Sequence, residues 1–207
     1  LQVNKPANST VIAAYLTSAV TSSLSAPGVT LNGTAVTFSH TATTNLGWGT
    51  FVNHFADVTS IVKSTIDNAP LGLVDISVAE AAGAAANEGQ SLIVVFDDPA
   101  KPASSVIIMF GASKTTGDSF SFSFPSITDL NAQIPTLSLG IGFSYQTSSD
   151  RFQQSDVKLS TSSNTNLQTI SLTAGGFNDG AGADGALLTV GGVGDSPDLP
   201  GLTATSD

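Results

Sequence analysis

The chain has 207 residues, of which 41% are hydrophobic and only 11% are charged, and its formal net charge is −10. An average soluble domain has roughly 25% charged residues, so this composition excludes an intrinsically disordered chain and favours a folded domain with a sizeable core. Six basic residues scattered along the chain cannot neutralise a phosphate backbone, which argues against nucleic acid as a partner and against anionic membrane surfaces.

The sequence contains no cysteine, so disulfides and thiolate metal sites are impossible. It also contains no run of 18 apolar residues, so membrane insertion through a helix is not expected. Secreted domains without disulfides need another source of stability, and in bacterial surface proteins bound calcium often provides it. We therefore expect an extracellular, monomeric module of a longer bacterial cell-surface chain whose export signal lies elsewhere.

Apolar residues in the first half of the chain predict several β-strands and one helix. The predicted strands cover 11–16, 30–38, 74–78, 91–96 and 106–110, and the last two are joined by a short turn that contains Asp97, Asp98 and two prolines. The helix is predicted from Val58, Ile61, Val62 and Ile66, which share one helical face, with Asp57 placed to cap the first turn. Residues 79–87 fit either a second short helix or a loop of small residues.

The second half of the chain is rich in residues that alternate with a period of two. Phe120, Phe122 and Phe124 alternate with serines, and apolar residues alternate with small or polar ones over 137–145. Further strands are predicted at 157–160, 168–172 and 186–190. Many short strands at this spacing predict an all-β fold, an antiparallel β-sandwich that forms one ligand-binding domain over 1–207, with 199–207 as a tail or the start of a linker.

The residues that would mark an enzyme do not form a recognised constellation. His40 and His54 are the only histidines, and we expect both to be polar residues near strand or helix ends. The triplet Gly194-Asp195-Ser196 is similar to the nucleophile turn of some serine hydrolases, but the glycines of an oxyanion hole and a following histidine are missing. Aromatic residues are only 7% of the chain, which is little stacking surface for a carbohydrate cleft. We expect no enzymatic activity.

Acidic and glycine residues are concentrated in the final third of the chain. Asp179, Asp184, Asp195 and Asp198 lie in glycine-rich stretches on either side of the predicted strand 186–190, and Asn178 precedes the first of them. Glycine allows a backbone that aims carbonyl oxygens inward, and calcium takes six to eight oxygen ligands. These five residues are therefore predicted calcium ligands. The alternative is that they form ordinary Asp-Gly turns without a metal.

A second predicted calcium site contains Asp97 and Asp98 at the end of the strand 91–96. Adjacent carboxylates repel each other, and either a metal ion or a hydrogen-bonded turn at Pro99 would relieve that repulsion. Glu88, which precedes Gly89, is predicted to add a further ligand.

Three segments resemble the peptide-binding domain of giant calcium-dependent RTX adhesins. They are Val52-Asn53-His54-Phe55-Ala56-Asp57-Val58-Thr59, then LIVVFDDP at 92–99, then GALLTVGGVGDS at 185–196, and in their order and spacing they cover roughly 10–198.

The resemblance implies a calcium-stabilised β-sandwich near the tip of an adhesin. It also implies that the domain binds the C-termini of peptides on cell-surface proteins, with the free carboxylate meeting a bound calcium ion. Asp179, Asp184, Asp195 and Ser196 match the segment in which that ligand would bind. Two other interpretations stay open, namely a lectin-like module that binds sugar hydroxyls through calcium and a structural spacer. For a sugar site only Trp48, Tyr15 and Tyr145 offer a large ring with a polar edge.

Overall fold

The computed structural model describes residues 1–21, 26–45, 49–81, 87–114, 118–121, 139–141, 153–160, 168–175 and 188–190. The chain divides into two compact units, unit 1 over Leu1–Thr115 and unit 2 over Thr116–Asp207. All strand pairs among the described residues are antiparallel, and these residues contain one helix. The fold is therefore all-β and sandwich-like, which confirms the fold class predicted from the sequence. That the whole chain acts as one ligand-binding domain stays a prediction.

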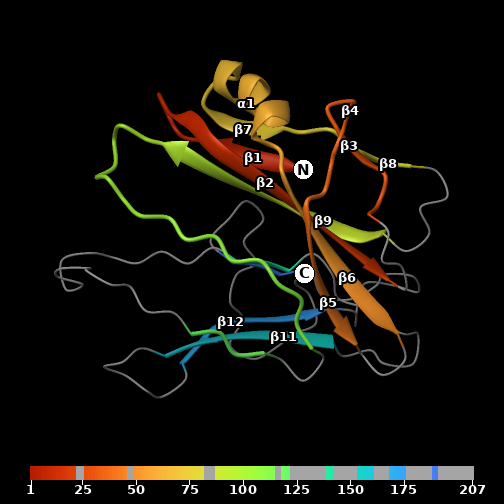
Figure 1. Cartoon of the computed structure of the whole chain (residues 1–207). Coiled ribbons are helices and arrows are strands. Elements are labelled where there is room, and N and C mark those ends of the chain that lie inside the picture. Colours follow the sequence, from red (N-terminus) through yellow and green to blue (C-terminus); the bar gives the residue numbers. More distant parts are fainter. Residues whose placement is uncertain are drawn as a thin grey trace. The chain divides into compact units, whose positions relative to one another are not determined.

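The largest sheet of unit 1 has four strands in the order β5-β6-β2-β9. Their bounds are His40–Asn45 for β5, Thr50–Asp57 for β6, Thr10–Thr21 for β2 and Asn87–Asp97 for β9. In Figure 1 β2 and β9 run side by side as the two longest strands. The sheet's inner face carries Leu16, Val52 and Ala56, which are buried, whereas the opposite face carries Tyr15 and Phe55, which are half-buried.

Two smaller sheets complete unit 1. One pairs β1 (Gln2–Lys5) with β7 (Gly72–Asp75), and the other has the order β4-β3-β8, with β3 at Val29–Leu31, β4 at Thr34–Ala35 and β8 at Val78–Glu80. Asn32 and Gly33 connect β3 to β4 with positive φ angles of 49° and 79°. This is the geometry that Asn-Gly favours in a tight hairpin, because both central residues must adopt φ above zero.

The helix α1 (Thr59–Asn68) packs against β2. Val58, Val62 and Ile66 are buried and Ile61 is partly buried, so the helical face predicted from the sequence is confirmed. The carboxylate of Asp57 accepts a hydrogen bond from the Thr59 backbone N–H at 2.9 Å, although Val58 occupies the N-cap position itself. Asp57 thus satisfies one of the free N–H groups at the helix start, as expected.

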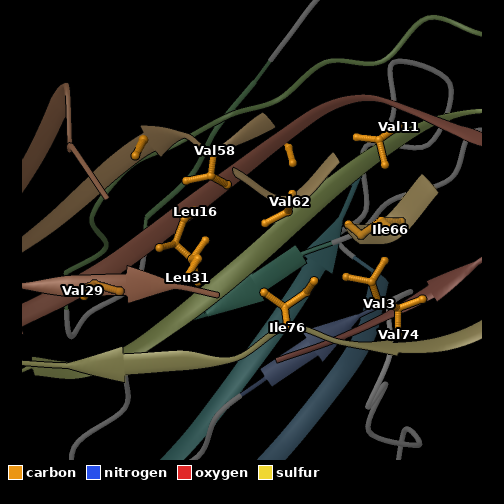
Figure 2. Packing of buried hydrophobic residues seen from close by; sticks show 12 residues of the cluster. Val3, Val11, Leu16, Val29, Leu31, Val58, Val62, Ile66, Val74 and Ile76 are labelled. Atoms are coloured by element: carbon orange, nitrogen blue, oxygen red, sulfur yellow. The ribbon is translucent and has the colours of Figure 1, made fainter. Parts of the chain in front are cut away.

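The core of unit 1 lies between α1, the inner face of the four-stranded sheet and the smaller sheets. Figure 2 shows Val62 and Ile66 of α1 pointing toward side chains from β1, β3 and β7, among them Leu31. Leu16 and Leu31 are fully buried, and each such side chain contributes about 1.5–3 kcal/mol relative to an exposed one. The buried side chains join all three sheets to the helix, so unit 1 has a continuous core.

Unit 2 contains two strand pairs among its described residues. β11 (Gln153–Leu159) pairs with β12 (Gln168–Gly175), and β10 (Leu139–Ile141) pairs with β13 (Leu188–Val190). The strands predicted at 168–172 and 186–190 are thus confirmed in their described parts, as are residues 157–159 of the strand predicted at 157–160 and residues 139–141 of the one predicted at 137–145. Of the predicted Phe120–Phe124 strand, Phe120 and Ser121 lie outside any strand, and the remainder lies outside the described residues.

Two strand predictions in unit 1 need correction, and the segment left open between helix and loop is strand at both ends. The strand predicted at 30–38 is the β3–β4 hairpin, because the Asn32-Gly33 turn interrupts it. The strand predicted at 74–78 is two strands, β7 and β8, which belong to different sheets. Residues 79–80 and 87, at the two ends of the segment left open between helix and loop, belong to β8 and β9.

The strand predicted at 106–110 is wrong, because these residues form no strand. Side-chain packing replaces backbone pairing here. The Phe110 ring lies 5.1 Å from the Phe55 ring between centroids, and the Asn53 side-chain amide donates to the Gly111 carbonyl at 2.8 Å. The segment therefore crosses β6 on the outer face of the sheet, and Val106 and Ile107 are left more than half exposed.

Candidate functional site

The Asp97–Asp98 pair lies where β9 ends, and a hydrogen-bonded turn follows directly. Asp97 is exposed and opposite Thr10 of β2, whereas Asp98 is half-buried. The Asp98 carboxylate accepts a hydrogen bond from the Ala100 N–H at 2.9 Å, and the Asp98 carbonyl accepts one from the Lys101 N–H at 3.0 Å. An aspartate at the first position of a turn with proline next is a favoured arrangement. The turn thus engages one of the two adjacent carboxylates.

This turn offers only part of a calcium coordination shell. The described residues contain no group of three or more histidine, aspartate or glutamate side chains placed to hold a metal ion. Glu88 lies in β9 nine residues before Asp97, so at the rise of an extended strand the two backbones are roughly 30 Å apart. Calcium binds its oxygen ligands at about 2.3–2.6 Å. A single ion therefore cannot join Glu88 to Asp97 and Asp98, and any calcium at the turn needs its remaining oxygens from other residues.

Glu88 has a distinct backbone setting at the other end of β9. The pairing between β2 and β9 shifts register there, since Ala19 lies opposite Gly89 and Val20 lies opposite Asn87. Glu88 is the extra residue of this β-bulge. Bulges interrupt the ladder and redirect neighbouring side chains, and they are frequent next to functional sites. The sequence gives no sign of the bulge apart from the glycine that follows Glu88.

The other predicted calcium and ligand residues lie outside the described residues, but strands delimit the segments that contain them. Asn178, Asp179 and Asp184 belong to the connection between the end of β12 at Gly175 and the start of β13 at Leu188. Asp195, Ser196 and Asp198 follow the end of β13 at Val190. The prediction that one apolar strand separates two acidic, glycine-rich stretches is therefore confirmed, whereas the metal ligands themselves stay a prediction.

An aromatic cluster covers part of the outer face of the four-stranded sheet. The rings of Tyr15 and Phe55 stack with centroids 5.1 Å apart, and the Phe110 and His40 rings lie 5.1 and 6.1 Å from the Phe55 ring between centroids. Sequence reasoning missed this cluster because it did not predict β6, whose polar and aromatic composition hides the alternation. Tyr15 pairs with Ile93, four residues before Asp97, so it lies roughly 13 Å along the strands from the acidic turn. A sugar site at the Asp97–Asp98 turn would require an adjacent aromatic ring, and Tyr15 is too far from the turn to provide it.

Two of the six basic residues are used at the C-terminal end of α1. Lys5 is buried, and its ammonium donates to the carbonyls of Asp67 and Ala69 at 2.6 and 2.7 Å. Lys63 forms an ion pair with the Asp67 carboxylate at 2.9 Å and also donates to the Val11 carbonyl. The Lys63 hydrogen bond and the Val11 N–H hold the pKa of Asp67 below its ordinary value. These cations stabilise the helix end and its junction with β1 and β2.

His54 is placed differently from the prediction that it lies near the end of an element. It lies inside β6 on the inner face of the sheet and is only 1% exposed. Neither ring nitrogen has a hydrogen-bond partner among the described residues. Desolvation by burial lowers the pKa of the His54 imidazole. By contrast, His40 is the first residue of β5, as expected, and is exposed.

Comparison of the chain with protein-family models, with curated proteins and with solved structures found no match. Within the ranges that the structure describes, no helix has the length and apolar character needed to cross a membrane.

Proposed function

We propose that this chain is an extracellular, non-enzymatic module of a bacterial adhesin that binds calcium and uses it to hold the free C-terminal carboxylate of a peptide on a partner cell. The observation that supports it best is the arrangement around β13. An acidic, glycine-rich stretch with Asp179 and Asp184 precedes this short strand in the sequence. A second such stretch, with Asp195 and Asp198, follows it. Such stretches supply the carboxylate and carbonyl oxygens that calcium requires.

The charge of the chain supports a metal-mediated rather than a direct contact with a carboxylate. The chain has 16 acidic and six basic residues, so an anionic ligand meets net repulsion. Lys5 and Lys63 are engaged at the end of α1 and cannot bind a ligand without weakening the fold. A bound calcium ion provides a strong local positive charge, and glycine-rich backbone N–H groups add donors for the carboxylate.

The ligand site is expected to draw on both acidic stretches. β13 spans three residues, or about 10 Å, so the stretch before it and the stretch after it start at opposite ends of the strand. We expect Asp195 and Ser196, together with Asp179 and Asp184, to hold the ion that meets the ligand. At the turn after β9, Asp97 and Asp98 would hold a structural ion.

The experiment measures calcium binding and peptide binding in the same set of variants. Asp184→Asn and Asp195→Asn each remove one negative oxygen without changing side-chain size. We expect both variants to bind calcium at least tenfold more weakly and to lose affinity for a peptide that ends in a free aspartate. The matched control is Asp75→Asn, an exposed aspartate of β7 whose side-chain oxygen accepts a hydrogen bond from Gln2 and would still do so as an amide.

Wild-type affinity for both ligands in Asp184→Asn and Asp195→Asn would contradict the proposed site. Calcium binding without any peptide binding would leave the spacer interpretation. Calcium-dependent binding of simple sugars instead of the peptide would favour the lectin-like module.

A further inference from the structure

A row of polar side chains crosses the inner face of the four-stranded sheet, next to the apolar core of unit 1. In register across the strands lie Thr41 of β5, His54 of β6, Ser18 of β2 and Gln90 of β9. His54 and Ser18 are 1% and 0% exposed, so the centre of the row is sealed from water. The rows on either side carry apolar pairs, Leu16 with Ala56 and Val20 with Val52. The apolar rows on either side of His54 therefore offer no group that favours a charge on its ring.

The two ends of the row differ in their contacts. The Gln90 side-chain amide donates to the Glu80 carboxylate at 2.8 Å and lies 3.5 Å from the Ser18 hydroxyl. At the other end, Phe38 contacts the His54 ring with centroids 5.6 Å apart. Both nitrogens of His54 lack a hydrogen-bond partner in the part of the chain that the structure describes. Through these hydrogen bonds one carboxylate, that of the exposed Glu80, is connected to the row. It contacts Gln90 of β9, a strand that lies two strands, or roughly 10 Å, from β6.

Among the side chains that the structure describes on the surrounding strands, no other titratable group compensates a charge on His54. Those on the opposite face or at exposed strand ends are Tyr15 of β2, His40 of β5 and Asp57 of β6, and Asp97 ends β9, which is two strands away. A buried charge without a partner is strongly unfavourable, and a histidine avoids this cost by staying neutral.

We infer that His54 is a built-in acid switch of unit 1, whose protonation breaks the packing of β6 against β5 and β2 when the surroundings become mildly acidic. The sign follows from linkage. In the unfolded chain histidine binds a proton near pH 6.5, whereas in the folded unit His54 stays neutral to lower pH. Below about pH 6.5 the unfolded state therefore binds one more proton, and the unfolding equilibrium constant rises by up to about tenfold per pH unit. This inference does not depend on the proposed ligand.

The experiment follows urea unfolding of the full chain by far-UV circular dichroism at pH 7.5, 6.5, 6.0 and 5.5. This window lies above the range in which ordinary carboxylates titrate. We expect the wild-type unfolding constant to rise steeply below pH 6.5, approaching tenfold per unit. His54→Phe retains a ring but cannot be protonated, so its unfolding constant should change much less. His40→Gln removes the only other histidine, which is exposed on the same sheet, and should keep the wild-type response.

Acid sensitivity that persists unchanged in His54→Phe, or a wild-type protein insensitive down to pH 5.5, would overturn the inference. If His54→Phe does not fold, the wild-type protein still decides. In its NMR spectrum we expect the His54 ring signal of the folded state to stay constant in position and to lose intensity as the pH falls, while amides of β5 and β6 exchange faster. A His54 signal that titrates near pH 6.5 without faster exchange would contradict the switch.

Discussion

Replacing Lys5 with methionine removes a buried cation from the C-terminal end of α1. The Lys5 residue is 8% exposed, and its ammonium donates to two carbonyls, Asp67 at 2.6 Å and Ala69 at 2.7 Å. Both carbonyls belong to the C-terminal end of the helix, where the last backbone carbonyls have no intrahelical N–H donor. Methionine keeps the length and the apolar stem of the side chain, so the substitution mainly removes these two donors and the charge that faces the negative end of the helix.

The expected loss of stability follows from these contacts. A hydrogen bond that involves a charged group contributes about 1.5–3 kcal/mol, and two of them give about 3–6 kcal/mol. Burying an ammonium costs part of that gain, and methionine no longer carries this cost. We therefore expect Lys5→Met to lower the free energy of unfolding by about 2–4 kcal/mol, a large share of the total for a domain of this size.

The assay is urea unfolding at pH 7.5, monitored by far-UV circular dichroism, with the slope of free energy against urea compared between variants. Lys101→Met is the control, because Lys101 is exposed in the turn after β9, and it should change stability by less than about 0.5 kcal/mol. A Lys5→Met protein within about 0.5 kcal/mol of the wild type would refute the assignment of Lys5 as the helix-end cap.

Three further predictions concern unit 1. Leu16→Ala, at a fully buried position, should lower the free energy of unfolding by about 2–5 kcal/mol in the same urea assay. Asp98→Asn should keep the turn, because an amide oxygen can still accept from the Ala100 N–H. Asp98→Ala removes that acceptor and should lower the free energy of unfolding by about 1 kcal/mol. Weakened calcium binding in the Asp98→Asn protein would instead assign a metal ion to this turn. The pKa of Asp67 is lowered in the fold, so the stability that it provides is present above about pH 4 and is lost as the pH falls below that value. Asp67→Asn should therefore lose stability at pH 7 but show a smaller difference from the wild type in acid, which unfolding curves at pH 7 and pH 3 would measure.

The elements that the sequence predicts best are those with a clean apolar period. β2 and β9 each contain a run of apolar or β-branched residues, and α1 shows its buried face at helical spacing, so their types were predicted correctly and only their ends differ. β6 escaped prediction because buried His54 lies where the alternation requires an apolar residue. The apolar run 106–110 was misleading for the opposite reason, since its β-propensity is realised by packing on a sheet face and not by backbone pairing.

The site was less predictable than the fold. The turn after Asp98 follows from local chemistry, because aspartate before proline favours it, and this was one of the two predicted alternatives. Whether Glu88 can bind the same ion as Asp97 and Asp98 depends on the length of the strand between them, which composition does not reveal. A single strand holds them roughly 30 Å apart, whereas a loop of the same number of residues could bring them together. The polar row through His54 needs the register of four strands, which no local pattern specifies.

The measurement that tests the central claim most directly is a calorimetric titration of the full chain with two peptides that differ only at their ends. Both end in aspartate, one with a free C-terminal carboxylate and one with an amide, and each is titrated in millimolar calcium and again in excess chelator. We predict binding only for the free carboxylate and only with calcium. Equal binding of the amidated peptide, or binding that survives the chelator, would contradict a calcium-held carboxylate.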